Sequence, residues 1–228
     1  METDYIIIGG GSSGAVLAGR LSEDADCRVT LLEAGGRGDN WVVKTPFAGV
    51  LQVPSKLNNW AFETVPQAGL NGRRGYQPRG RVLGGSSAIN AMVYIRGHRS
   101  DYDAWAAAGN PGWGFDELLP YFIRAENNVR FGAPWHGQDG PLRVGDLRTD
   151  SPLHEAWLEA ARTQGHPVVE DFNAARMEGL GVYQVTQFEG ERWSAARGYL
   201  HPHLGRRANL DLQTDTRVLR ILIENRRA

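Results

Sequence analysis

The stretch DYIIIGGGSSGAVLAGRL, residues 4–21, decides the fold. Tyr5–Ile8 is a short run rich in β-branched residues, and the three glycines Gly9–Gly11 follow it. Apolar residues then recur at helical spacing up to Leu21, and Arg28–Leu32 is a second run typical of a strand. The order strand, glycine turn, helix, strand predicts a parallel β-α-β unit.

The glycine turn carries the motif G-x-G-x-x-G at Gly9, Gly11 and Gly14. In such a motif the first glycine permits a tight turn, the second lets a diphosphate approach the backbone, and the third lets the helix pack on the strand. Ser12 and Ser13 begin the helix, whose unpaired N–H groups and positive dipole end favour the same diphosphate. We therefore expect these five residues to bind a dinucleotide.

Glu33 ends the second predicted strand, about 20 residues after Gly14, where dinucleotide-binding folds place an acid. Its carboxylate can accept hydrogen bonds from the ribose hydroxyls of an adenosine. It would repel a 2′-phosphate, so NADP is disfavoured. The motif does not distinguish NAD from FAD, which share the ADP half. A glycine-rich helix cap that binds nothing is the structural alternative.

Bulk properties narrow the class of protein. A chain of 228 residues with 41% hydrophobic residues can bury a core, and a formal net charge of −1 gives no reason to expect nucleic acid. Cys27 is the single cysteine, and the sequence starts without a signal-peptide pattern, so we expect a cytoplasmic protein. No apolar run approaches the roughly 20 residues of a membrane-spanning helix, which leaves only peripheral membrane association open.

The remainder of the chain alternates irregular and periodic segments. Residues 35–81 have little periodicity, which is typical of a long segment that wraps a ligand. The patterns predict a helix that begins within 87–93, helices over 102–108 and 115–125, a helix over 153–164 capped by Ser151-Pro152, a strand over 182–188, a helix over 194–200, and strands over 210–214 and 218–224.

A second glycine turn lies in PRGRVLGGSSAINAMVYIRGH, residues 78–98. It is not a second ADP motif, because no β-α-β unit surrounds it and no acid follows at the right distance. This stretch resembles the N-terminal signature of the glucose-methanol-choline (GMC) flavoprotein oxidoreductases. Further segments resemble that family along the whole chain, among them 59–60, 66–67, 70–73, 109–113 and 192–196, and the segment 183–187 is most similar to the bacterial alcohol dehydrogenase and choline dehydrogenase branch.

The resemblance implies an α/β fold: a Rossmann-like FAD-binding domain of the GMC type with part of a second, α+β substrate domain. It implies FAD-binding parts at about 1–145 and 205–228 and a partial substrate-domain segment at about 146–204. It also implies a truncated chain, in which the C-terminal catalytic half is absent.

Residues around the second turn are expected to face the flavin. Gly84 and Gly85 remove side chains where backbone must press against a flat ring, and Ser86 and Ser87 can cap a following helix. The resemblance implies that a further set lines the isoalloxazine ring, with the Asn90 amide offering a donor and an acceptor. This set is Val82, Asn90, Ala91, Met92 and Val93.

The resemblance also places Ala34 and Gly35 around the ribose and the backbone of Val218 against the adenine. Some family members carry a flavin-linked histidine immediately before the signature asparagine, whereas this chain has Ile89 there. Isoleucine cannot form that bond, so we expect non-covalent FAD.

The family's reaction takes a proton from an alcohol hydroxyl and transfers a hydride from its carbon to FAD. The histidine that accepts the proton belongs to the C-terminal half, so we assign no catalytic residue to this chain. His98 follows the flavin segment but reads as structural or solvated, His201 and His203 read as a loop and not a metal pair, and His136 and His154 have no recognisable partners. We assign no metal site.

The expected function is an FAD-dependent oxidoreductase that converts a small-molecule alcohol to an aldehyde. A primary aliphatic alcohol is the first expectation for the substrate and choline the second, and the electron acceptor is unknown. Two alternatives stay open: a truncated, non-catalytic FAD-binding fragment, and an NAD-binding dehydrogenase.

Overall fold

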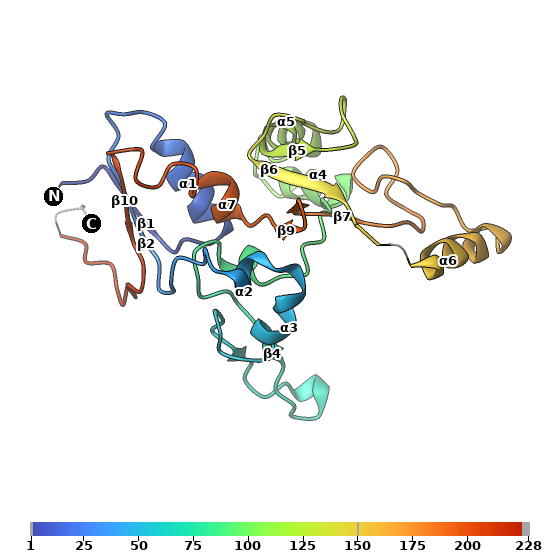
Figure 1. Ribbon diagram of the computed structural model, residues 1–228, viewed down its shortest axis with the longest axis horizontal. Coiled ribbons are helices and arrows are strands. Elements are labelled where there is room, and N and C mark those ends of the chain that lie inside the picture. Colours follow the sequence, from blue (N-terminus) through green and yellow to red (C-terminus); the bar gives the residue numbers. More distant parts are fainter. Residues whose placement is uncertain (1, 150, 225–228) are drawn as a thin grey trace. The chain divides into compact units, whose positions relative to one another are not determined.

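The computed structural model describes residues 2–149 and 151–224. The chain divides into two compact units, the first made of Met1–Ala91 and Gly190–Ala228 and the second of Met92–Glu189 (Figure 1). These boundaries differ from the predicted ones at about 145 and 205. The predicted division into cofactor and substrate parts stays a prediction.

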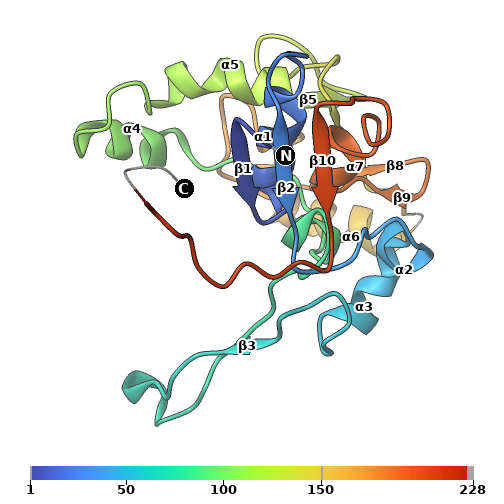
Figure 2. The same cartoon turned by 90° about the vertical axis from the view of Figure 1, so that its left-hand side faces the viewer.

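The first unit is built on a three-stranded parallel sheet in the order β1-β2-β10, made of β1 (Tyr5–Ile8), β2 (Val29–Leu32) and β10 (Leu210–Gln213). Figure 2 shows β2 between its two neighbours. Val29 is the partner of Tyr5 on one side and of Leu210 on the other. Helix α1 (Ser12–Leu21) connects β1 to β2, which confirms the predicted β-α-β unit.

Helix α1 packs on this sheet and on α7 (Ala195–Tyr199), which Figure 1 shows beside it. Ala15 and Ala18 on α1 and Leu31 in the sheet are completely buried in the resulting core. The two helices approach at backbone distance, because a Cβ added at Gly19 would lie 2.5 Å from the carbonyl oxygen of Tyr199. Small residues on α1 therefore fix how closely α7 can pack.

Short elements interrupt the segment that was expected to lack structure, residues 35–81. They are α2 (Trp41–Lys44), the 3₁₀ helix Pro46–Ala48, α3 (Gly49–Gln52), β3 (Phe62–Glu63), the 3₁₀ helix Ala68–Leu70 and β4 (Tyr76–Gln77). None exceeds four residues, which explains the weak periodicity of the sequence.

The α-helix expected to begin within 87–93 is wrong. A 3₁₀ helix, Gly85–Ala88, takes its place, and the chain then becomes extended. Met92 has a φ of 63°, which a right-handed helix cannot contain.

The strand expected over 218–224 is also wrong for the described residues. The chain there lacks a continuous strand partner, and Leu219 and Ile223 are 84% and 71% exposed. Apolar and β-branched residues favour a strand only where a neighbouring strand accepts their backbone hydrogen bonds. The neighbouring prediction over 210–214 is confirmed by β10.

The second unit contains α4 (Arg99–Ala107), α5 (Phe115–Ala125) and α6 (Pro152–Thr163), all three predicted from the sequence. Ser151 precedes α6, but its side chain makes no capping hydrogen bond. The strands β5 (Glu126–Asn128), β6 (Leu142–Asp146) and β7 (Gln184–Val185) form a mixed sheet in that order.

The single strand predicted over 182–188 is two short ones, β7 and β8 (Gln187–Phe188). The strand β9 (Glu191–Arg192) belongs to the first unit, and strands β5 and β6 were not predicted. Across the described ranges, the helices are too short or too polar to cross a lipid bilayer.

Candidate functional site

The first glycine turn joins β1 to α1 as a tight, backbone-only connection. The Gly9 N–H donates to the carbonyl oxygen of Leu32, 2.8 Å away, which ties the turn to the end of β2. A Cβ added at Gly14 would lie 2.0 Å from the carbonyl oxygen of Gly9. Only glycine therefore allows the start of α1 to sit so close to β1.

The N-terminus of α1 presents backbone donors. Within the described residues, the N–H groups of Ser12, Ser13 and Gly14 have no protein acceptor, and the capping residue Gly11 has no side chain to supply one. The two serine side chains are exposed. Unpaired N–H groups at the positive end of a helix dipole attract an anion such as a diphosphate.

Glu33 lies next to this helix end and is only 5% exposed. Its two carboxylate oxygens accept hydrogen bonds from the backbone N–H groups of Gly10 and Gly35, at 2.7 and 2.8 Å. A carboxylate oxygen carries two lone pairs, so each still has capacity for another donor. Glu33 thus has the position and the acceptor capacity to bind ribose hydroxyls.

The second glycine turn packs directly on the first. The Gly84 N–H donates to the Gly10 carbonyl oxygen at 2.7 Å. Gly85 has a φ of +53°, and a Cβ added to it would lie 2.7 Å from the Gly11 Cα. The backbones of the two turns therefore touch, and only glycine fits at this approach. This contact brings together two motifs that are far apart in the sequence.

Ser86 and Ser87 stabilise the second turn and do not cap an α-helix that follows them in the sequence, which corrects that expectation. The Gly80 N–H donates to the Ser86 hydroxyl at 3.1 Å. The Ser87 hydroxyl donates to the Gly84 carbonyl oxygen at 2.6 Å and accepts from the Ala195 N–H at 2.9 Å. Because these contacts restrain the turn from three sides, its shape is fixed by the protein itself.

A cavity of about 340 Å³ opens beside the two turns. Six of the predicted cofactor residues line it: Gly9, Gly11, Glu33, Ala34, Gly85 and Val218. Residues from both turns, from the end of β2 and from the segment after β10 thus meet at one concave site. This site lies at the carboxyl ends of parallel strands, where open α/β sheets bind their ligands.

Trp60 also lines this cavity, and the sequence did not single it out as a ligand contact. The guanidinium carbons of Arg81 and Arg217 lie 5.1 and 5.4 Å from its ring centre. Its only sequence signal was its place in one of the short segments that resemble the GMC family.

The residues expected around the isoalloxazine ring are not gathered in this cavity. Val82 is completely buried and packs with Val43 and Ala88, so its side chain is a core residue. Asn90 and Ala91 belong to the first unit and are exposed, whereas Met92 and Val93 belong to the second unit. Their contact with a flavin stays a prediction, as does that of Gly84.

The second unit contains a buried polar cluster that the sequence did not reveal. The carboxylate of Glu126 is completely buried, and it pairs with Arg96 Nη2 at 2.6 Å and with His136 Nδ1 at 2.9 Å. Asn128 Nδ2 donates to the same carboxylate at 2.8 Å. The other ring nitrogen of His136 lies 2.8 Å from an oxygen of Asp171.

His136 is therefore not a histidine without partners, which corrects the expectation from the sequence. Burial alone would lower the pKa of His136, but hydrogen bonds and negative charge from Asp171 and Glu126 outweigh it and raise the pKa to about 9. Burial likewise opposes the charge on Asp171, but the hydrogen bond with His136 holds the pKa of that carboxyl below its usual range. Glu126 and Asp171 lie 171 − 126 = 45 residues apart in the sequence, so only the fold unites them. Together with Arg96 and His136 they form a charged structural core.

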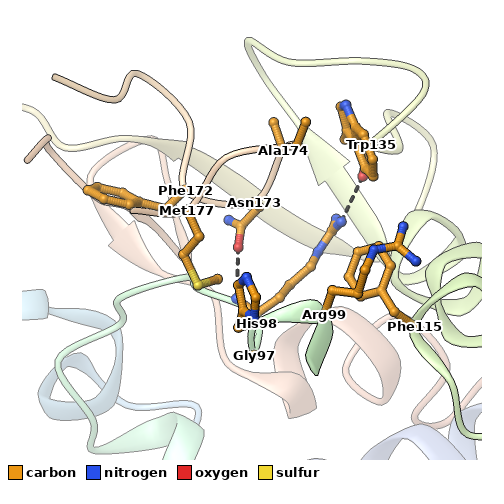
Figure 3. Close-up of a pocket in the computed structure, with 11 residues that line it drawn as sticks. Gly97, His98, Arg99, Phe115, Trp135, Phe172, Asn173, Ala174 and Met177 are labelled. Atoms are coloured by element: carbon orange, nitrogen blue, oxygen red, sulfur yellow. Dashed lines mark hydrogen bonds between the residues drawn. The ribbon is translucent and has the colours of Figure 1, made fainter. Parts of the chain in front are cut away.

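A second cavity, of about 260 Å³, lies beside this cluster (Figure 3). At its wall the Arg96 N–H donates to Asn173 Oδ1 and Arg96 Nη1 donates to the Trp135 carbonyl oxygen, both at 2.7 Å. The Arg96 charge is neutralised by Glu126. The cavity lining is mixed, with the aromatic rings of Phe115 and Phe172 beside the polar side chains of His98 and Asn173.

The remaining histidines that were considered have structural surroundings. The His98 side chain accepts from the Ser100 N–H at the start of α4, and Asp101 completes the capping box. His201 and His203 lie in the turn after α7, and burial lowers the pKa of both. Among the described residues, no group of three or more histidine, cysteine or acidic side chains is suited to hold a metal ion.

Comparison with known proteins agrees with the class of fold described above. The chain belongs to the GMC oxidoreductase family, whose model matches residues 3–228. Members of this family are FAD flavoproteins.

Particular relatives are similar along the whole chain. It is 48% identical over 226 residues to the alcohol dehydrogenase (acceptor) of Pseudomonas putida, covering 99% of this chain and 41% of that protein. It is 46% identical over 234 residues to the mitochondrial choline dehydrogenase of Homo sapiens, covering 100% of this chain and 39% of that protein. The chain thus spans about two fifths of the length of these relatives.

Solved structures are likewise similar to nearly the whole of this chain, which covers less than half of each of them. The pyridoxine 4-oxidase from Mesorbium loti has a TM-score of 0.91 at 39% identity, covering 98% of this chain and 44% of that one. A formate oxidase has a TM-score of 0.87 at 26% identity, covering 97% of this chain and 40% of that one.

Proposed function

We propose that this chain forms the cofactor-binding part of an FAD-dependent oxidoreductase that acts on CH–OH groups. The observation that carries the proposal is the contact between the two glycine turns beside a cavity that Glu33 and Val218 also line. Membership of the GMC family supports FAD over NAD as the dinucleotide.

The residues fit the ADP half of FAD. The free N–H groups at the start of α1 match a diphosphate, and the glycines keep side chains away from it. Glu33 can accept from ribose hydroxyls beside Ala34, and Val218 lines the same cavity, where its backbone would meet the adenine. FAD, when bound, supplies the hydride acceptor. We propose that it is bound non-covalently, because Ile89 occupies the position before Asn90.

We propose a primary aliphatic alcohol as the substrate, with an aldehyde as the product. The relation to an alcohol dehydrogenase at 48% identity supports this choice, and the relation to choline dehydrogenases at 46% or less supports choline as the second candidate. No residue of this chain is proposed to take the hydroxyl proton. The electron acceptor is left unassigned, and a cytoplasmic location stays a prediction.

The alternative from another class is a chain that binds FAD but does not turn over a substrate. Its support is the extent of the match, because the chain spans about two fifths of the relatives' length.

The visible spectrum of the purified chain, followed by anaerobic addition of substrate, separates these readings. The panel is ethanol, 1-butanol, choline and pyridoxine. Flavin absorbance that bleaches with an aliphatic alcohol supports the enzyme, and bleaching with choline alone supports the second candidate. Flavin that stays oxidised supports the binding chain. A folded, colourless chain that binds NAD and not FAD would overturn the proposal.

A further inference from the structure

Arg192 is a buried cation without an acidic partner. It lies in β9 and is 1% exposed. Among the described residues, no carboxylate lies within ion-pair distance of its guanidinium, and Nη2 makes no hydrogen bond. Burial lowers the pKa of Arg192 to about 10. Placing a guanidinium in such surroundings opposes folding, and a methionine of similar length would avoid that penalty.

The guanidinium instead donates hydrogen bonds to the segment that follows the second glycine turn. Its Nη1 donates to the Asn90 carbonyl oxygen at 2.8 Å, to Asn90 Oδ1 at 2.9 Å and to the Ser87 carbonyl oxygen at 3.3 Å. Its Nε donates to the Val43 carbonyl oxygen at 3.1 Å, which anchors the arginine to α2. One side chain therefore joins residues that are 102 to 149 positions away from it in the sequence.

These contacts fix the orientation of the Asn90 amide. Arginine has only donors, so the oxygen of the Asn90 amide must face it and the NH₂ group must face away. The main chain of 87–90 is held by the same guanidinium, directly after the Gly85 backbone that touches Gly11. Arg192 thus fixes the main chain of 87–90, which continues from the two touching glycine turns.

We propose that Arg192 is a positioning residue for the cofactor: it fixes the main chain of 87–90 and the amide of Asn90 before FAD binds. This inference rests on the proposed FAD site. A wall that is already ordered loses less conformational entropy on binding, so its arginine contributes to FAD affinity without touching FAD.

The test is a double-mutant cycle on FAD affinity with R192M, N90A and the double variant. R192M should weaken FAD binding about tenfold, as expected for the loss of hydrogen bonds to a charged group. The double variant should lose less affinity than the sum of the two single losses, because N90A already removes the amide that Arg192 orients, while the main-chain contacts of Arg192 remain in N90A. R192K should recover part of the affinity. Unchanged affinity in folded R192M, or fully additive losses, would overturn the proposal.

The matched control is R207M. Arg207 also lies in the first unit and donates to the Gly19 carbonyl oxygen and the Ser22 hydroxyl, away from the glycine turns. R207M should lower stability and leave FAD affinity unchanged.

Hydrogen exchange of the chain without FAD separates this inference from the proposed function. Backbone amides in 87–92 should exchange at least tenfold faster in R192M than in R207M. Equal exchange in the two variants would refute the positioning role even if the wild-type chain binds FAD. A wild-type chain that binds no FAD, with the exchange difference present, would refute the proposed function and the cofactor role together while retaining the ordering of the segment.

Discussion

The two units each bury a glutamate, and the partners of the two carboxylates differ. The carboxylate of Glu126 in the second unit accepts hydrogen bonds from Arg96, His136 and Asn128, so charged and polar side chains of the protein surround it. Glu33 in the first unit accepts from two backbone N–H groups, and no cationic side chain among the described residues pairs with it. Glu33 also lines a cavity.

This difference separates a structural site from the proposed binding site. A carboxylate whose lone pairs and charge are satisfied by the protein, like that of Glu126, holds the surrounding elements together. A carboxylate held only by backbone donors keeps acceptor capacity for a ligand. The buried arginines follow the same division, since Arg96 is paired with an acid whereas Arg192 contacts carbonyl and amide oxygens.

The largest expected effect is on the second unit. Glu126→Gln removes the buried counter-ion of Arg96 and leaves a charged His136 with Asp171 as its remaining acid, and it should lower the free energy of unfolding by about 3–5 kcal/mol. Urea denaturation measures it, with the exposed Glu155→Gln on α6 as the matched control. A loss below about 1 kcal/mol would mean that the cluster is not the charged core described here.

Raising the pH should have the next largest effect. The pKa of His136 is raised to about 9, so its stabilising contribution is complete below its ordinary pKa of about 6.5 and is lost as the pH rises through 9. Unfolding free energy should fall by about 2–3 kcal/mol between pH 6.5 and 9.5. The pKa of Asp171 is lowered, so its contribution is present above about pH 4 and is lost on further acidification.

His136→Gln is the control for the pH series, because glutamine does not titrate. The variant should lose the alkaline slope. A slope that persists in His136→Gln would assign the pH dependence to other groups.

Glu33→Gln should have the smallest effect on stability of the three. It turns one acceptor into a donor facing a backbone N–H group, which should lower the free energy of unfolding by about 1–2 kcal/mol. FAD affinity should fall as well, in contrast to Glu126→Gln. Equal FAD affinity in both glutamine variants, measured by flavin fluorescence, would remove the distinction between the two carboxylates.

Local patterns predicted the elements that local interactions determine. The β-α-β unit and the helices at 102–108 and 115–125 follow from periodicity and glycine breaks, and all three are confirmed. The strand over 218–224 and the helix starting within 87–93 failed because strand pairing and the positive φ of Met92 depend on residues distant in sequence.

The same limit applies to the site. That Gly9, Gly11 and Glu33 meet at one place could be predicted from the sequence, because each position depends on a neighbouring strand or helix. The contact of Gly85 with Gly11 and the pairing of His136 with Glu126 could not be predicted, since these residues meet only in the folded chain. Trp60 and Arg192 were missed for the same reason.

The most direct test of the central claim, that the two touching glycine turns form the FAD cradle, is an FAD titration of the wild-type chain and of Gly85→Ala. The added Cβ would lie 2.7 Å from the Gly11 backbone, whereas Gly69 has open space around it, so Gly69→Ala is the control. We predict stoichiometric FAD binding by the wild type and Gly69→Ala, and at least a hundredfold weaker binding by Gly85→Ala, roughly 3 kcal/mol. Equal FAD affinity in all three folded chains would contradict the account.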